Sequence, residues 1–194
     1  MTNIIVLCTA NVCRSVIARE LLSRGLADHG VRARVRSAGM LDSGEPAAPE
    51  VVRALGAVGI DVSAHRSSRM TDADLQSADL ILAMAREHLR YAVVLAPAVW
   101  PRTFTIRELV RRATSAGSRR PDQPLANWLD LVHQGRDRLD LLGERAADDI
   151  ADPMGGPPEG YDATVAQLDD LTRLLIRLAW GPQAPRGAPP RSGP

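Results

Sequence analysis

Two apolar runs and two further strand-like segments along the chain predict the strands of one parallel sheet. Residues 4–7 and 78–84 are continuous runs, residues 34–39 form a short strand that ends in a turn, and residues 100–106 supply a fourth. Strands that are buried on both faces carry such runs, whereas half-exposed strands alternate. A helix between the first two strands makes a βαβ unit, which implies parallel pairing and a right-handed crossover. We therefore predict an α/β fold, a three-layer sandwich with a central parallel four-stranded sheet flanked by helices.

Apolar residues at helical spacing fill most segments between and after these strands. The first helix is predicted over residues 16–25, with Gly25 or Gly30 as its stop. Further helices are predicted to begin near residues 49, 72, 86 and 107, and a last one covers residues 161–180. A helix over residues 125–142 would bury one stripe of five side chains: Trp128, Leu129, Val132, Leu139 and Leu142.

The length of the chain fits one domain, and its net charge is too small to produce a strong electrostatic field. The 194 residues are 45% hydrophobic and carry a formal net charge of +1, which is ordinary for a globular protein. All 24 basic residues are arginine, but they are scattered and form no patch of the kind that binds nucleic acid. We predict a domain over residues 1–182, with a longer helical segment around 114–147. Residues 183–194 are predicted to be a disordered tail rich in proline, glycine and arginine.

Targeting signals and membrane spans are not expected. The first residues lack a basic region, the apolar run after them is too short for a signal peptide, and no stretch approaches the roughly 20 apolar residues of a membrane span. Both cysteines, Cys8 and Cys13, lie in one loop, so no disulfide framework is predicted. These features predict a cytoplasmic protein.

The loop between the first strand and the first helix concentrates the candidate chemistry. It reads CTANVCRS over residues 8–15, so that Cys8 opens it and Arg14 closes it. Backbone N–H groups at a helix N-terminus converge on one spot, where the helix dipole also favours negative charge. The guanidinium of Arg14 can donate hydrogen bonds to two oxygens of a phosphate at once. The positive field of the helix N-terminus and this arginine is expected to lower the pKa of the Cys8 thiol. The loop therefore predicts a nucleophile and an oxyanion cradle in one segment.

This loop resembles the signature of the low-molecular-weight protein tyrosine phosphatase family. Family loops read Cys-x-Gly-Asn-x-Cys-Arg-Ser-Pro, and here Ala10 replaces the glycine and Val16 the proline. The resemblance covers roughly residues 3–112 and 148–180. It implies hydrolysis of a phosphate monoester through a phosphocysteine on Cys8, without a metal or cofactor. The phosphate-binding set that it implies around Arg14 is Thr9, Ala10, Asn11, Val12, Cys13 and Ser15.

A second motif supplies a candidate general acid. The alkoxide or phenoxide that leaves needs a proton, and a positioned carboxylic acid typically contributes 10²–10⁴-fold. Asp152 precedes Pro153 in a loop before the last helix, where the resembled family keeps its acid. Pro153 stiffens that loop, whereas Asp148, Asp149 and Asp162 lack the motif. An isolated Asp-Pro is a common turn, but together with the cysteine loop it predicts Asp152 as the general acid and then the base.

The substrate slot and its support are interpreted through the same resemblance. The Ser37 hydroxyl is expected to hydrogen-bond the phosphate loop and steady it. Met40, Leu41 and Met154 stand where family members often carry the aromatic residues that flank a phosphotyrosine ring. Methionine can still pack against a ring through its polarisable sulfur.

The other polar residues near the loop are assigned structural roles. Ser15 is expected to donate a hydrogen bond to the thiolate, and Asn11 to organise the loop, because asparagine tolerates left-handed backbone geometry. His65 is interpreted as a residue that braces the loop rather than a catalytic base, and His88 as a helix cap or a surface residue. As in the family, Cys13 is a candidate to form a reversible disulfide with the nucleophile.

Several substrates and functions stay open on the sequence alone. Protein phosphotyrosine is favoured over a small phosphate ester, and phosphate, sulfate or vanadate are the expected active-site anions. Thioredoxin-coupled arsenate reductases share this fold and loop but need further cysteines, which this chain lacks. Phosphoarginine phosphatases of the family carry threonine where Val12 stands, so valine favours phosphotyrosine. A phosphoprotein-binding module would need neither thiolate nor acid, so the presence of Cys8 and Asp152 argues against it.

Overall fold

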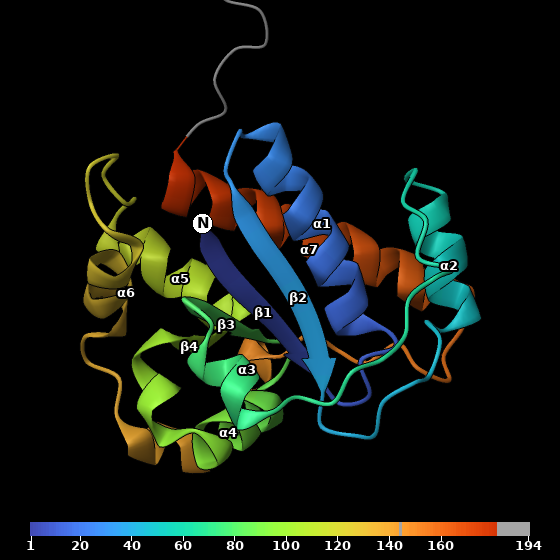
Figure 1. Ribbon diagram of the computed structural model, residues 1–194, viewed down its shortest axis with the longest axis horizontal. Coiled ribbons are helices and arrows are strands. Elements are labelled where there is room, and N and C mark those ends of the chain that lie inside the picture. Colours follow the sequence, from blue (N-terminus) through green and yellow to red (C-terminus); the bar gives the residue numbers. More distant parts are fainter. Residues whose placement is uncertain (144, 182–194) are drawn as a thin grey trace, which may run out of the picture.

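The computed structural model describes residues 1–143 and 145–181, so the predicted tail over residues 183–194 lies outside the described residues. Four parallel strands form one sheet in the order β2-β1-β3-β4 (Figure 1). Their bounds are Thr2–Cys8 (β1), Ala33–Gly39 (β2), Leu80–Ala83 (β3) and Thr103–Thr105 (β4). The predicted parallel four-stranded α/β fold is therefore confirmed.

Helices cover both faces of the sheet, because side chains of β1 alternate between two apolar clusters. Ile4 and Val6 face the larger cluster, and Ile5 and Leu7 face the smaller one. The larger cluster is closed by five helices: α1 (Arg14–Asp28), α2 (Pro49–Gly56), α5 (Ile106–Ala116), α6 (Leu125–His133) and α7 (Pro158–Trp180). The smaller cluster is closed by α3 (Asp72–Gln76), α4 (Arg86–Leu95) and the 3-10 helix η1 (Pro97–Arg102). Helices, sheet and helices make the three predicted layers.

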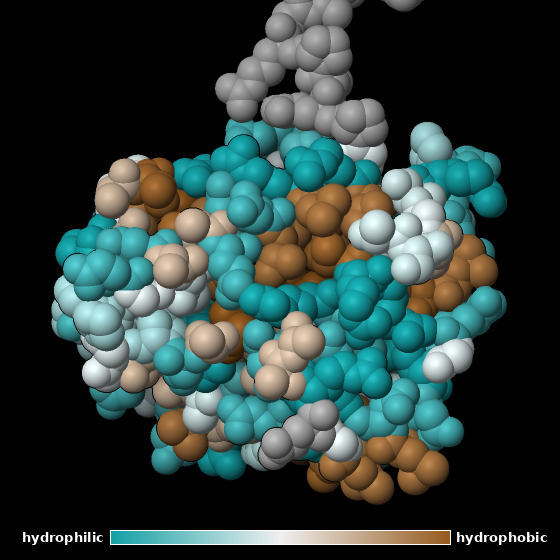
Figure 2. Space-filling view, turned by 180° about the vertical axis from the view of Figure 1, so that it is seen from behind, coloured by the Kyte–Doolittle hydropathy of each residue, from teal (hydrophilic) through white to brown (hydrophobic). Residues whose placement is uncertain are grey.

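The outer face of α7 carries partly exposed apolar side chains. Leu171, Leu174 and Leu178 are only half-buried there, and hydrophobic side chains gather near the middle of the face seen from behind (Figure 2). Within the part of the chain that the structure describes, no helix combines the length and the apolar character that a bilayer crossing requires.

The fourth strand is shorter than the apolar pattern predicts. It comprises only Thr103–Thr105, and the residues before it form η1 instead of strand. Pro101 has no N–H to offer a sheet ladder. The chain therefore stays in the 3-10 helix as far as Arg102, and pairing with the sheet begins at Thr103.

The first helix runs through Gly25 and ends before Gly30. A Cβ atom on Gly25 would lie 2.5 Å from Cδ1 of Ile176, so the glycine permits close packing of α1 against α7. Gly30 has a φ of 70° and takes the left-handed conformation that follows a helix end. Of the two predicted stops, Gly30 is the one used.

The predicted helix over residues 125–142 is wrong beyond His133. The α-helix ends there, Gly135 adopts a φ of 75°, and Arg138–Leu142 forms a separate 3-10 helix, η2. Leu139 and Leu142 are 70% and 78% exposed, so neither belongs to the buried stripe. The other three predicted members of that stripe, Trp128, Leu129 and Val132, are buried in the larger cluster.

Arg136 provides a physical reason for this break. Its guanidinium carbon lies 3.7 Å from the ring centroid of Trp100 and 4.1 Å from that of Phe104. It also binds Glu108 through two hydrogen bonds of 2.8 and 3.1 Å, although only 2% of the arginine side chain is exposed. A buried charge requires such partners, and the chain reaches them because it turns at Gly135. Tertiary contacts have therefore overridden the helical spacing.

Candidate active site

The loop over residues 8–15 lies at the carboxyl edge of the sheet. Cys8 is the last residue of β1 and Arg14 the first of α1, so the predicted order of strand, loop and helix is present. Asn11 has a φ of 55°, the one positive value for a non-glycine residue in the described part of the chain. This left-handed residue turns the backbone and brings its own N–H to within 3.3 Å of Cys8 Sγ.

Two hydrogen-bond donors face the sulfur of Cys8. Ser15 Oγ lies 3.0 Å from Cys8 Sγ, and Asn11 Nδ2 donates to the same Ser15 oxygen at 2.9 Å. Because an amide nitrogen only donates, Ser15 accepts from Asn11 and keeps its own proton for the sulfur. The Asn11 backbone N–H is the second donor. Donors of this kind favour an anionic sulfur.

The second thiol of the loop has a different environment. Burial raises the pKa of Cys13 to about 12, and the negative charges of Asp152 and Cys8 add to this effect. Cys13 is therefore a neutral thiol near pH 7. Both cysteines are free and buried, and the donors described above serve Cys8.

Arg14 joins this loop to the predicted acid, which is 138 residues away in sequence. Its Nη2 donates to Asp152 Oδ2 at 2.5 Å and to Thr9 Oγ1 at 3.3 Å, and its Nη1 donates to the Ile150 carbonyl at 3.2 Å. The arginine side chain is 6% exposed and that of Asp152 is 44% exposed. The structure therefore brings together the sequence-predicted nucleophile loop, phosphate-binding arginine and acid, with the acid on the open side.

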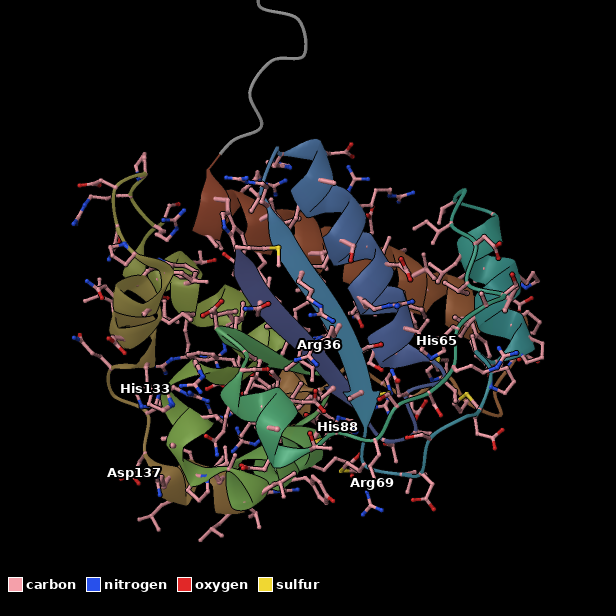
Figure 3. The ribbon with its side chains drawn as sticks, viewed as in Figure 1. Arg36, His65, Arg69, His88, His133 and Asp137 are labelled. Atoms are coloured by element: carbon pink, nitrogen blue, oxygen red, sulfur yellow. The ribbon has the colours of Figure 1, made fainter. Side chains whose placement is uncertain are left out.

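The segment that follows α2 holds Asn11 in place through two hydrogen bonds. His65 Nε2 lies 2.7 Å from the Asn11 carbonyl oxygen, and the Ser68 N–H donates to Asn11 Oδ1 at 2.9 Å. His65 is buried and lies between α1 and α2 in the view of Figure 3. Its predicted role in bracing the loop is confirmed.

The Ser-Ala-Gly segment supports the loop through its glycine rather than its serine. The Ser37 hydroxyl makes no hydrogen bond within residues 1–143 and 145–181, so the predicted bond to the phosphate loop is absent. A Cβ atom on Gly39 would lie 2.7 Å from the Thr9 carbonyl oxygen and 2.9 Å from the Asn11 nitrogen. The N–H of Met40 then donates to that Thr9 carbonyl at 2.7 Å. The absence of a side chain on Gly39 lets the two backbones touch, so the supporting residue is this glycine and not the serine two positions before it.

We expect the substitution Gly39→Ala to lower kcat/KM for an aryl phosphate by about 10²-fold, because a shift of about 1 Å in a catalytic loop has an effect of that size. The added methyl must push the backbone at Thr9 away. Steady-state kinetics checks the loss, and Gly56→Ala is the matched control, since a Cβ on Gly56 meets nothing within 4 Å. Equal activities in the two variants would contradict the close-approach argument.

His88 is the functional candidate that the sequence analysis placed wrongly. It is fully buried and not a surface or cap residue, and its Nε2 lies 2.9 Å from Thr9 Oγ1. It follows β3 by five residues and therefore reaches the same carboxyl edge as the cysteine loop (Figure 3). That position in a parallel sheet is the signal that the prediction passed over.

The residues predicted for the slot walls form an apolar rim. Leu41 and Met154 are 55% and 48% exposed, and Met40 is half-buried against the smaller apolar cluster. The buried Tyr161 donates to Met154 Sδ at 3.8 Å, so this aromatic residue lies behind the methionine. Their contact with a substrate stays a prediction.

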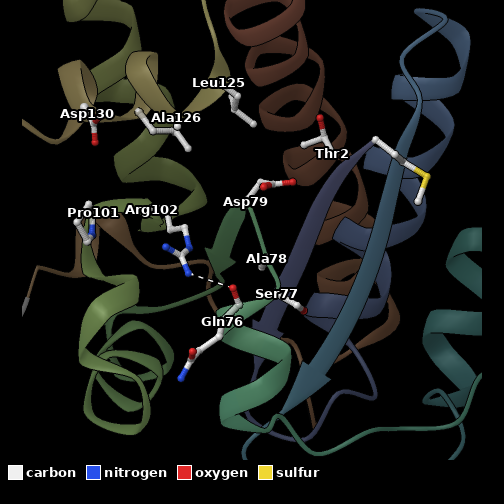
Figure 4. A pocket seen from close by; sticks show the side chains of 12 residues that line it. Thr2, Gln76, Ser77, Ala78, Asp79, Pro101, Arg102, Leu125, Ala126 and Asp130 are labelled. Atoms are coloured by element: carbon white, nitrogen blue, oxygen red, sulfur yellow. Dashed lines mark hydrogen bonds between the residues drawn. The ribbon is translucent and has the colours of Figure 1, made fainter.

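Two hollows are relevant to the choice of site. One of 380 Å³ opens beside Arg14 and Asp152 and is bounded on its other side by Glu87 and Arg90. A larger one of 520 Å³ lies at the opposite edge, where Asp79 and other residues at the amino ends of the strands line it (Figure 4). The larger hollow is lined by neither Arg14 nor Asp152, so its size does not make it the candidate active site. Among the described residues, no three His, Cys, Asp or Glu side chains are grouped to hold a metal ion.

Known proteins are similar to this chain in both sequence and fold. Residues 3–127 match the family model described as low molecular weight phosphotyrosine protein phosphatase. A protein-arginine-phosphatase of Bacillus subtilis (strain 168) is 34% identical over 141 residues, which are 72% of this chain and 91% of the relative. A probable low molecular weight protein-tyrosine-phosphatase, EpsP of Ralstonia solanacearum, is 31% identical and covers 72% of this chain and 97% of its own. A solved structure of the YwlE arginine phosphatase, a cysteine-to-serine mutant with a phosphorylated active-site serine, has a TM-score of 0.69 at 28% identity and covers 91% of this chain and 94% of its own.

The chain therefore belongs to the low-molecular-weight phosphotyrosine protein phosphatase family. The predicted family, the fold class and the assignment as a phosphatase are confirmed. The relatives include both arginine and tyrosine phosphatases.

Proposed function

We propose that this protein hydrolyses phosphate monoesters, most favourably protein phosphotyrosine, through a phosphocysteine on Cys8. One observation carries the proposal: a thiol with two donors at its sulfur lies in the same loop as a buried arginine that contacts Asp152. The phosphorylated serine of the YwlE mutant, in the position of an active-site residue, supports a covalent intermediate in that relative. Neither donors to the sulfur nor a paired acid is needed for binding alone.

The first step transfers the phosphoryl group to sulfur. The Cys8 thiolate attacks phosphorus in line with the leaving oxygen, while Arg14 and the loop N–H groups hold the other oxygens. The bond from phosphorus to the leaving oxygen breaks as the S–P bond forms. Asp152 gives its proton to that oxygen, so the alcohol or phenol leaves neutral. Arg14 contacts Asp152 before substrate binds, and the incoming phosphate shares the same guanidinium.

The second step releases phosphate from sulfur. Asp152 is now ionised and removes a proton from water, whose oxygen attacks phosphorus as the S–P bond breaks. The electron pair returns to Cys8, where the donors from Ser15 and Asn11 face it. The acid and base roles of Asp152 are the two directions of one proton transfer.

Turnover of an aryl phosphate tests this reaction class. The wild-type protein should hydrolyse p-nitrophenyl phosphate at slightly acidic pH with a metal chelator present, and orthovanadate should inhibit it competitively. Absence of turnover with intact folding would contradict the proposal, and the loop would then be assigned to anion binding alone.

The substrate class is tested at position 12. Val12 is a half-buried member of the loop. Its methyl groups would leave the N–H groups of a phosphoarginine unpaired, whereas a phenyl ring needs no such partner. We expect wild type to have the higher kcat/KM on a phosphotyrosine peptide than on a phosphoarginine peptide of the same sequence. Val12→Thr should shift that ratio toward phosphoarginine by about tenfold.

Arginine phosphatase activity is the second candidate, because the Bacillus subtilis relative carries that name. Val58→Thr is the matched control for the position-12 test, since Val58 lies in an exposed turn after α2. A wild-type preference for phosphoarginine would make this second candidate the function. Preference for a small phosphate ester over both peptides would instead indicate a small-molecule phosphatase.

A further inference from the structure

A fully buried histidine stands behind the phosphate loop and takes no part in the steps described above. His88 Nε2 lies 2.9 Å from Thr9 Oγ1 and 3.2 Å from Glu87 Oε1. Its other nitrogen, Nδ1, is buried and has no hydrogen-bond partner among the described residues. All polar contacts of the ring are therefore made by the nitrogen that faces the loop.

The position of the ring proton follows from these contacts. Burial, reinforced by the positive charge of Arg14, lowers the pKa of His88 to about 3, so at pH 7 the ring is neutral and carries one N–H. A carboxylate oxygen attracts an N–H and repels a ring lone pair, so the nearby Glu87 oxygen favours the proton on Nε2, whose hydrogen bond is made to Thr9. The other tautomer would leave a buried Nδ1–H unpaired, and orphaned N–H groups are rare in folded proteins. We therefore assign the ring hydrogen to Nε2.

The Thr9 hydroxyl consequently has both of its acceptor positions filled. It receives the His88 Nε2–H and also the Nη2–H of Arg14 at 3.3 Å. A hydroxyl has two lone pairs and one proton, so its own proton must point away from both donors. Arg14 Nη2 contacts Asp152 as well, so the Thr9 hydroxyl oxygen lies next to the guanidinium that joins the loop to the acid.

We propose that His88 is a positioning residue that holds the Thr9 hydroxyl as an oriented donor to an oxygen of the bound phosphate group. This inference rests on the phosphatase function proposed above. When the His88 N–H is absent, the hydroxyl can rotate, and its proton is no longer directed toward the substrate. A donor that is already oriented needs no reorganisation during the reaction, which is why it stabilises the transition state.

A double-mutant cycle between His88→Leu and Thr9→Val tests the inference. The readouts are the Kd for inorganic phosphate and kcat/KM for p-nitrophenyl phosphate. Each single substitution should weaken phosphate binding and lower kcat/KM by about tenfold or more, the usual effect of losing a hydrogen bond to a charged group. The double variant should be no worse than Thr9→Val, because His88 acts through the hydroxyl.

Conservative variants separate positioning from packing. His88→Gln keeps an N–H with similar reach and Thr9→Ser keeps the hydroxyl, so both should restore most of the lost activity. His29→Leu is the matched control, since His29 caps the far end of α1, and it should leave both readouts unchanged. Additive losses in the double variant, or no loss in either single variant, would overturn the inference.

Nitrogen-15 NMR of the unaltered protein provides an independent test. The His88 ring should show its hydrogen on Nε2 and should not titrate between about pH 8 and pH 5, as its lowered pKa requires. A hydrogen on Nδ1 would overturn the inference even if His88→Leu failed to fold. Binding of phosphate without ester hydrolysis by wild type would refute the proposed function alone, whereas failure to bind phosphate would refute both.

Discussion

Cys8→Ser is expected to lower kcat for p-nitrophenyl phosphate by on the order of 10⁴–10⁶-fold, the range seen when an enzyme loses its nucleophile. A serine hydroxyl holds its proton far more tightly than a thiol, and no base lies at the sulfur position to remove it. Ser15 and the Asn11 N–H are donors, which stabilise an anion but cannot accept the proton. The measurement is a steady-state rate with enough protein to detect residual turnover.

The other cysteine of the loop is the matched comparison for this loss. Cys13→Ser should lower kcat by less than about tenfold, since burial keeps the Cys13 thiol protonated and unreactive. Cys8→Ser should still bind inorganic phosphate within a few-fold of wild type, because Arg14 and the loop N–H groups are retained. A Cys8→Ser protein that kept wild-type turnover would refute the nucleophile assignment.

Asp152→Asn is expected to lower kcat for phenyl phosphate by about 10²–10⁴-fold, the contribution of a positioned general acid. The loss should be much smaller for p-nitrophenyl phosphate, because p-nitrophenolate leaves without needing a proton. The asparagine side-chain oxygen can still accept from Arg14, so the geometry of the pair is kept. The removed negative charge should leave KM unchanged or lower it, since it no longer repels phosphate.

Comparison of the two leaving groups makes this prediction specific. A structural effect would lower kcat equally for both esters, and that outcome would remove Asp152 from the role of general acid. Asp162→Asn is the matched control, because Asp162 pairs with Arg53 at the surface at 2.8 Å and is 52% exposed. Its kcat should equal that of wild type for both esters.

Agreement between sequence and structure is closest where the information is local. The cysteine loop is contiguous, so the end of a strand, a left-handed Asn11 and the start of a helix are enough to place Cys8 beside Ser15. The strands of the sheet centre were predictable for a related reason. A strand buried on both faces must be apolar at nearly every position, and such runs are visible in the chain.

Agreement fails where a residue acts on a distant segment. Helical spacing continued past residue 133, but the guanidinium of Arg136 reaches Trp100, Phe104 and Glu108 only because the helix ends. Ser37 carried a plausible hydroxyl, whereas the contact that matters is the bare backbone of Gly39 against Thr9. In both cases the deciding partner is at least 28 residues away in sequence.

The amino-acid sequence by itself determined the α/β class, the phosphate loop and the chemistry that its thiol and arginine can perform, because each depends on neighbouring residues. The tertiary structure decided which carboxylate meets Arg14, which glycine supports the loop and what His88 does. These depend on distances across the fold, and burial then changes the protonation of a side chain, as it does for Cys13 and His88. No local sequence pattern indicates this burial, because the side chains become buried only when the sheet brings the loops together at one edge.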